Sequence, residues 1–261
     1  HLPRADRKGG EPVKLLRLEF YKCRRRKIAL VCAAVLAAQL FWFWVVLSRQ
    51  SAEEMQQGWM LMLYNFAVVD AIMLPVATAV LASRSCGIEH KGCTLKLLET
   101  AASPAQLYRA KLLWGALALG GLLALRGAIL VCIGVTLGFP GEVPTTRIIL
   151  FTVLTWAVSV TLYLLQQGLS LRYANQAPAL ICGIFGSFAG LMSMLLPSFV
   201  QRMVPWSYYG LLSLTGMNWN PTTHVTWFYW FWPPVTNFVL LACWAILFFV
   251  IGRTLFVRKE V

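Results

Sequence analysis

The chain has 261 residues, of which 59% are hydrophobic, and its 23 Lys and Arg against 10 Asp and Glu give a formal net charge of +13. A soluble domain of this size would expose too much apolar surface to water, so this composition excludes an ordinary soluble globular protein. Continuous runs rich in Leu and Ala, in place of short alternating strands, also exclude an outer-membrane barrel. We therefore expect an all-α polytopic membrane protein with one transmembrane domain, residues 1–261.

Six runs are long enough to cross a bilayer, which requires roughly 20 apolar residues per helix. They lie at residues 28–47, 58–82, 112–137, 147–170, 177–197 and 236–257. Ahead of the first run, residues 12–22 interleave apolar side chains with Lys14, Arg17, Glu19 and Lys22. This pattern is typical of a helix that lies along the membrane interface and buries its apolar face there.

The distribution of Lys and Arg predicts the orientation in the membrane. A basic run from Lys22 to Lys27 precedes the first span and places the N-terminus in the cytoplasm, and six spans return the C-terminus to the same side. Most other basic residues also fall in the loops that this orientation makes cytoplasmic. Because membrane topology accounts for the positive charge, we expect no nucleic acid as a partner.

The cytoplasmic loop at residues 87–103 is charged and amphipathic. We expect a short helix from Ile88 to Glu99, with Gly92 as a break, and a second helix that runs into the third span. Ser103, Pro104 and Gln106 have the types and spacing of an N-cap, a first helical position and a capping box.

Cysteine and histidine residues in the same loop raise the question of a metal site. Cys86, His90 and Cys93 lie close together, but no second pair of ligands completes a four-coordinate site. We therefore predict no metal.

This arrangement resembles the permeases of ABC-2-type transporters. The resemblance rests on the interfacial helix, the six spans and an ordered set of loop residues, namely Glu89, Gly92, Thr94, Leu97, Leu98, Ser103, Pro104 and Lys111. Within that superfamily the chain is most similar to the small permease subunits of lantibiotic immunity and resistance exporters. Permeases for bacitracin-like peptides are close competitors.

The resemblance implies a coupling helix that docks on a separate ATPase. The residues implied in this coupling are Glu89, Lys91, Thr94, Leu95, Lys96, Leu97 and Leu98. The chain contains no G-x-x-x-x-G-K-[ST] sequence, so we expect no cofactor here and no enzymatic activity of its own. ATP and Mg would bind to two copies of the ATPase, and a second, non-identical permease would complete the translocator.

The implied function is removal of an amphipathic antimicrobial peptide from the bacterial cytoplasmic membrane. Another lipophilic substrate is an alternative. Residues 198–235 form a long outer segment that contains five of the eleven tryptophans. This composition is typical of an aromatic belt at the membrane interface, and it also fits short re-entrant helices that contact cargo. The candidate aromatic residues are Trp206, Tyr208, Tyr209, Trp219, Trp227, Trp230 and Trp232.

Two ionisable residues, Asp70 and Arg126, fall inside predicted spans, where each needs a partner or water. Counting 1.5 Å per residue, their depths differ by about 9 Å, which a tilted helix pair could bridge. They would form either an ion pair that locks two helices or part of an ion-coupled secondary transporter. Asp70 is the only carboxylate in the predicted spans, and no histidine lies in a span, so we do not expect an intramembrane hydrolase.

Small residues and a proline predict features of helix packing. Pro75 should loosen the second span, and Gly186-x-x-x-Gly190 allows close approach of another helix, with the partner permease as one candidate.

Overall fold

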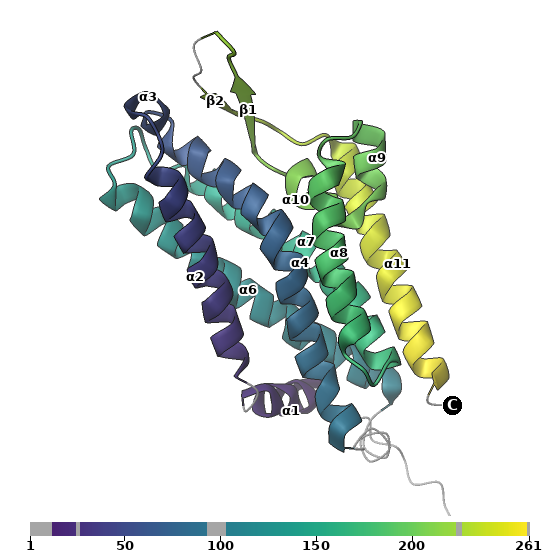
Figure 1. Cartoon of the computed structure of the whole chain (residues 1–261). Coiled ribbons are helices and arrows are strands. Elements are labelled where there is room, and N and C mark those ends of the chain that lie inside the picture. The colour runs from purple at the N-terminus through teal and green to yellow at the C-terminus, as the bar shows by residue number, and fades with distance from the viewer. Residues whose placement is uncertain (1–11, 25–26, 93–102, 223–225, 260–261) are drawn as a thin grey trace, which may run out of the picture.

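The computed structural model describes residues 12–24, 27–92, 103–222 and 226–259. Its long helices form a bundle (Figure 1) and are α2 (Ile28–Leu47), α4 (Gly58–Gly92), α6 (Pro104–Thr136), α7 (Thr145–Arg172), α8 (Ala177–Ser193) and α11 (Val235–Lys259). The helix α1 (Pro12–Arg24) lies across one end of this bundle, which we call the α1 end.

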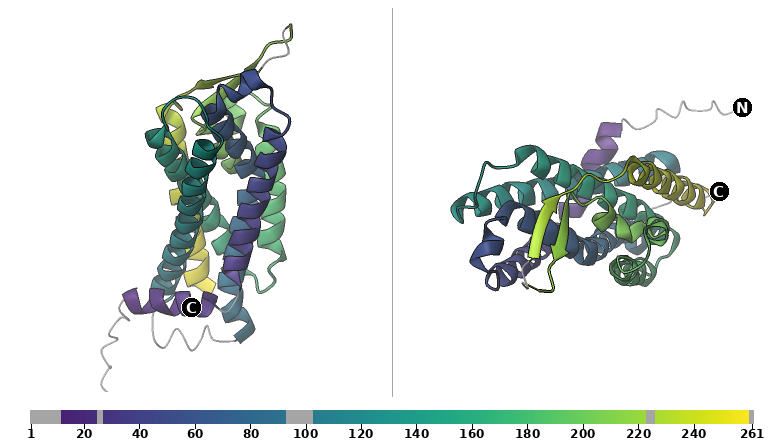
Figure 2. Two further views of the ribbon diagram at one scale, coloured as in Figure 1. Left: turned by 90° about the vertical axis from the view of Figure 1, so that its left-hand side faces the viewer. Right: turned by 90° about the horizontal axis from the view of Figure 1, so that it is seen from above.

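The opposite end carries a small antiparallel hairpin of β1 (Thr215–Trp219) and β2 (Thr226–Trp230), and we call it the hairpin end (Figure 1). Seen from above, the hairpin lies over the bundle (Figure 2). The expectation of an all-α chain did not include these strands. Short helical pieces at the same end are α3 (Ala52–Met55), α9 (Ser198–Met203), the 3-10 helix η1 (Pro205–Ser207) and α10 (Tyr208–Leu211).

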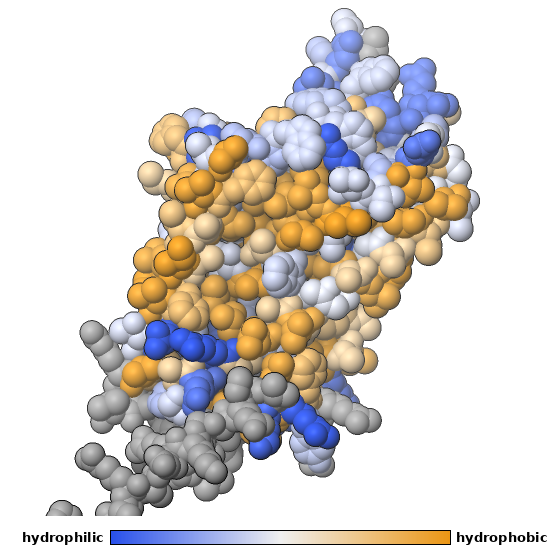
Figure 3. All heavy atoms as spheres, turned by 180° about the vertical axis from the view of Figure 1, so that it is seen from behind, coloured by the Kyte–Doolittle hydropathy of each residue, from blue (hydrophilic) through white to orange (hydrophobic). Residues whose placement is uncertain are grey.

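Within the described ranges, five helices are long and apolar enough to cross a membrane, namely α2, α4, α6, α7 and α11. The sixth apolar helix, α8, has 17 residues and ends at Ser193, earlier than the run expected at residues 177–197. A wide apolar band lies between more hydrophilic ends of the molecule (Figure 3). The chain is therefore a multi-pass membrane protein.

The helices α4 and α6 extend past the apolar runs that predicted them. The second span was expected to end near residue 82, yet α4 continues without a break from Gly58 to Gly92. The separate helix expected from Ile88 therefore does not begin there, because hydropathy marks the membrane boundary and not the end of a helix. Residues 93–102 of the expected coupling region lie outside the described residues.

The start of α6 matches the expected capping pattern. The Ser103 side chain accepts a hydrogen bond from the Gln106 backbone N–H, and the Gln106 side chain accepts one from the Ser103 N–H, at 3.0 Å. Pro104 follows at the first helical position, where its missing N–H has no cost. This prediction is confirmed.

The helix α4 passes through Pro75 because its neighbours bind the affected carbonyls. Proline has no N–H and leaves the carbonyl of Ala71 without its helical donor. The Ser187 hydroxyl of α8 donates to the carbonyls of Ala71 and Ile72, at 3.3 and 2.7 Å. The Gln166 amide of α7 donates to the Pro75 carbonyl at 2.9 Å. These contacts join α7 and α8 to the centre of α4.

The helix α1 packs on the bundle with a stripe that differs from the expected apolar face. Leu15, Glu19 and Cys23, four residues apart, are buried. Phe20 and Tyr21 are exposed. Glu19 was expected among the polar residues at the interface, and it faces inward because it has a buried partner, described below.

Candidate functional site

The polar centre of the bundle is an ion pair between Asp70 of α4 and Arg126 of α6. Arg126 Nη1 donates to Asp70 Oδ1, and both side chains are 1% exposed. The Gln39 amide of α2 donates to the same carboxylate oxygen at 2.8 Å. Three helices, α2, α4 and α6, therefore meet at one carboxylate.

Aromatic rings cover the guanidinium of Arg126. Its Cζ atom lies 5.4 Å from the ring centroids of both Phe66 and Phe151, a distance at which cation–π attraction operates. Asp70 Oδ2 and Arg126 Nε and Nη2 have no hydrogen-bond partner among the described residues. The ion pair thus fills the centre of the bundle, and three of its polar atoms could still form further hydrogen bonds.

A second buried ion pair lies at the α1 end, and the sequence reasoning missed it. Lys111 Nζ of α6 donates to Glu19 Oε2 of α1 and to the Ser85 carbonyl of α4, each at 3.1 Å. The side chains of Lys111 and Glu19 are 1% and 2% exposed. The Tyr163 hydroxyl of α7 lies 3.1 Å from Ser85 Oγ and 3.4 Å from the Lys111 carbonyl oxygen. We call Glu19, Ser85, Lys111 and Tyr163 the α1 junction.

The α1 junction includes residues of α4 and α6, the two helices that come before and after residues 93–102 in the sequence. Ser85 is about two turns from the end of α4, and Lys111 is about two turns from the start of α6. A buried charge pair therefore connects α1 to both of these helices near their ends. One signal in the sequence could have indicated the pair, because Glu19 is the only acidic residue between Pro12 and Arg24.

Most of the expected ATPase-coupling residues cannot be placed in this geometry. Glu89 and Lys91 belong to the last turns of α4. Thr94, Leu95, Lys96, Leu97 and Leu98 lie outside the described residues. The expectation that they contact an ATPase stays a prediction.

The aromatic residues of the outer segment separate into a buried and an exposed group. Tyr208 and Tyr209 are 0% and 4% exposed and belong to the core, where the Tyr209 hydroxyl lies 3.0 Å from Ser159 Oγ. Trp206 packs on α8 at Gly186 and Gly190, where an added Cβ would lie 2.1 and 2.8 Å from atoms of Trp206. The two glycines thus pack against a segment of their own chain.

The exposed aromatic group lies on and after the hairpin. The exposed fractions of Trp219, Trp227 and Trp232 are 57%, 60% and 61%. In the hairpin, Thr215 pairs with Trp230, and the pairing ends at Trp219 and Thr226. Successive side chains of a strand point to opposite faces of the sheet. Phe228 is buried, with its ring centroid 5.5 Å from that of Tyr64, so its neighbour Trp227 points to the other, exposed face.

Two polar side chains hold the hairpin against the bundle. The Gln57 side-chain oxygen accepts from the Phe228 N–H at 2.6 Å. Arg147 of α7 lies 5.1 Å from the ring centroid of Trp230 and 4.1 Å from that of Trp232, and it donates to the Phe231 carbonyl at 3.3 Å. Gln57 and Arg147 thus hold in place the segment that carries the exposed tryptophans.

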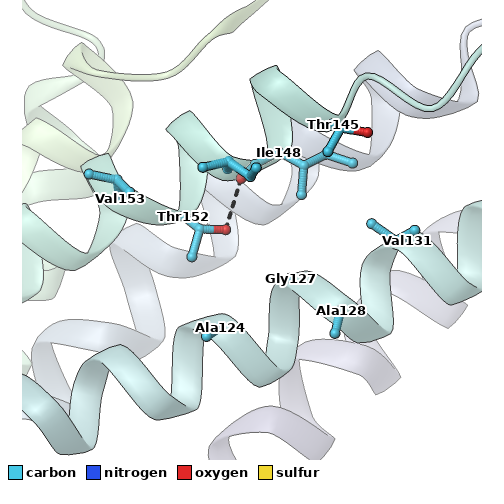
Figure 4. A pocket seen from close by; sticks show the side chains of 9 residues that line it. Ala124, Gly127, Ala128, Val131, Thr145, Ile148, Thr152 and Val153 are labelled. Carbon is cyan, nitrogen blue, oxygen red and sulfur yellow. Dashed lines mark hydrogen bonds between the residues drawn. The ribbon is translucent and has the colours of Figure 1, made fainter.

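A groove of about 330 Å³ lies between α6 and α7. Small residues of α6, Ala124, Gly127 and Ala128, face Ile148 and Thr152 of α7 (Figure 4). The Thr152 hydroxyl donates to the Ile148 carbonyl at 2.8 Å, so it is already satisfied. The groove offers apolar contact and no charged group.

Comparison with known proteins assigns this architecture to a family. The family model described as "ABC-2 family transporter protein" matches residues 15–190, more than half of the chain. No curated protein matches the sequence. The match covers α1, the α1 junction, the central ion pair and the helices up to most of α8. The chain therefore belongs to the ABC-2 transporter family and is a membrane permease subunit of an ABC transporter.

Proposed function

We propose that this permease works in an ATP-driven exporter that removes an amphipathic, lantibiotic-like antimicrobial peptide from the bacterial cytoplasmic membrane and so gives self-immunity or resistance. The observation that carries this proposal is the anchored, exposed aromatic group at the hairpin end, Trp219, Trp227 and Trp232. Indole rings bind at the boundary of water and lipid, which is where an amphipathic peptide accumulates. A bacitracin-like peptide or another lipophilic substrate would meet the same surface.

In this proposal the α1 end faces the cytoplasm, the hairpin end faces outward, and α8 is the sixth span. At 1.5 Å per residue, its 17 residues reach about 26 Å, slightly less than a bilayer core of about 30 Å. The segment from α9 to α10 packs its Tyr208 and Tyr209 into the core beside α8. This packing supports a re-entrant segment that completes the short span on the outer side.

The cargo path would lie between two permeases and not through this bundle. The centre of the bundle is closed by Asp70 and Arg126, which are buried and bonded to each other. A second, non-identical permease would supply the other wall. The family implies an ABC ATPase as partner. We place two copies of it, with their ATP and Mg, at the loop of residues 93–102.

An ion-coupled transporter is the alternative from another class. The observation that favours it is the set of unpartnered atoms at the central pair, Asp70 Oδ2 and Arg126 Nη2, in the described chain.

Export can be tested in a peptide-sensitive host that expresses the chain together with its ATPase and second permease. The inhibitory concentration of a lanthionine-containing peptide should rise relative to cells whose ATPase lacks its Walker lysine. Trp219→Ser with Trp227→Ser should reduce this protection about tenfold, since each aromatic contact contributes about 0.5–1.5 kcal/mol. Phe185→Ser is the matched control, because Phe185 is 70% exposed on α8, away from the hairpin.

Protection that survives in the ATPase-deficient cells would refute export by ATP hydrolysis. Full protection in the double tryptophan variant would refute the role of the hairpin. A bacitracin-like peptide, tested in parallel, shows which peptide class the complex handles.

Docking of the ATPase can be tested separately. Leu97→Asp with Leu98→Asp should abolish co-purification of the ATPase while membrane insertion is kept, because a charge in an apolar groove costs several kcal/mol without a partner. The measurement is mass spectrometry of the complex in detergent. A variant that retains its ATPase would contradict docking by these leucines.

A further inference from the structure

A cavity of about 490 Å³ lies where α1, α2 and α6 meet at the α1 end. Its floor is apolar and is formed by Cys23, Ile28 and Trp114, each 7% exposed or less. Its rim includes Phe20 and Tyr21 of α1, which are 47% and 60% exposed. The volume is in the range of small-molecule sites in proteins.

Among the residues that the structure describes, one cationic side chain, Arg17, also lines this cavity. Arg17 is exposed and makes no hydrogen bond or ion pair within the described part of the chain. Glu19, the only acidic residue of α1, is already bound to Lys111. Lys27, which is exposed and directly precedes Ile28 of the floor, adds a second positive charge nearby.

We propose that this cavity binds one anionic phospholipid. Arg17 would contact the phosphate, whose negative charge no headgroup ammonium offsets, and an acyl chain would cover Ile28, Trp114 and the side of α2. The positive charge of Arg17 and Lys27 favours an anionic lipid, because basic side chains at a membrane surface attract negatively charged headgroups. The position also fits, since α1 lies across the end of the spanning helices (Figure 2), where headgroups meet acyl chains.

This lipid would act on the same helix that the α1 junction holds. Glu19 and Cys23 fix α1 to the bundle on one stripe, and the cavity lies along the flank that carries Arg17 and Phe20. A bound lipid would therefore secure the second flank of α1. This inference concerns lipid and is independent of which cargo the transporter carries.

The site can be tested by native mass spectrometry of the full chain, purified in detergent and supplied with phosphatidylglycerol or phosphatidylcholine of identical acyl chains. Wild type should retain one phosphatidylglycerol more tightly than phosphatidylcholine. Arg17→Gln should weaken phosphatidylglycerol binding about fivefold and leave phosphatidylcholine unchanged, in keeping with one lost cation at a membrane surface. Ala118→Phe, which fills the cavity from α6, should weaken both lipids.

Arg109→Gln is the matched control, because Arg109 is an exposed cation of α6 outside the cavity. An equal loss in this control would show general surface attraction and overturn the site. Unchanged lipid retention in Arg17→Gln would overturn it as well. If Arg17→Gln kept its lipid but lost the ATPase on co-purification, the surface would belong to that protein and the lipid proposal would fail.

Discussion

Replacement of Asp70 by Ala is expected to lower the free energy of unfolding by about 3–5 kcal/mol, the usual cost of removing one partner from a buried ion pair. The Arg126 side chain, which is 1% exposed, would then carry a buried charge without its carboxylate partner, and the Gln39 amide would lose its hydrogen-bond acceptor. The measurement is denaturation in detergent, followed by tryptophan fluorescence. Glu53→Ala is the control, because Glu53 is exposed on α3 and its loss should change stability by less than about 0.5 kcal/mol.

The double variant Asp70→Leu with Arg126→Met decides what the pair is for. Buried ion pairs can often be replaced by apolar residues of similar volume without loss of stability, so this variant should recover most of the loss. If the pair only locks α4 to α6, the folded double variant should still export peptide. Export that fails in a stable double variant would favour the ion-coupled alternative. A double variant less stable than both single ones would contradict the pairing.

Replacement of Glu19 by Gln is expected to release α1 from the bundle. Lys111 would remain 1% exposed with its charge uncompensated, and undocking of α1 would give it access to water. Cys23, which lies on the buried face of α1 and is 3% exposed, should then react with a maleimide at least about tenfold faster. Mass spectrometry of the Cys23 peptide measures this rate without removal of the other cysteines.

Lys22→Gln is the matched control for the α1 junction. Lys22 also pairs with Glu19, at 3.5 Å, but its side chain is 17% exposed. Such partly exposed pairs contribute about 0–1 kcal/mol, so Cys23 should stay protected. Glu19→Gln with Lys111→Met should restore protection, because no charge is left buried. Slow labelling in Glu19→Gln itself would show that apolar packing alone holds α1.

The α1 junction links the two helices between which residues 93–102 stand in the sequence. Lys111 of α6 binds Glu19, and the Ser85 carbonyl of α4 binds Lys111, each within about two turns of the helix end that borders those residues. If the ATPase docks on residues 93–102, its movement would reach α1 and the spans together. Glu19→Gln should then uncouple ATP hydrolysis from export even in complexes that still assemble.

Features that depend on local chemistry could be predicted from the order of the residues. Apolar run length predicted the spanning helices, and the run at residues 28–47 has the bounds of α2. The capping box at Ser103 and Gln106 is a contact between near neighbours, so its spacing was sufficient. Asp70 and Arg126 could be singled out because charge is costly in a membrane.

Contacts between residues far apart in the chain depend on how the helices pack and could not be predicted from the sequence. Packing of α4 against α6 brings Asp70 and Arg126 together despite the depth difference expected from counting residues, and packing of α2 adds Gln39. Glu19 faces inward because it binds Lys111. These two residues are 92 positions apart in the sequence and meet only in the folded chain. Trp206 occupies the space that Gly186 and Gly190 leave open. Helical periodicity describes one element at a time, and each of these contacts depends on how several elements pack.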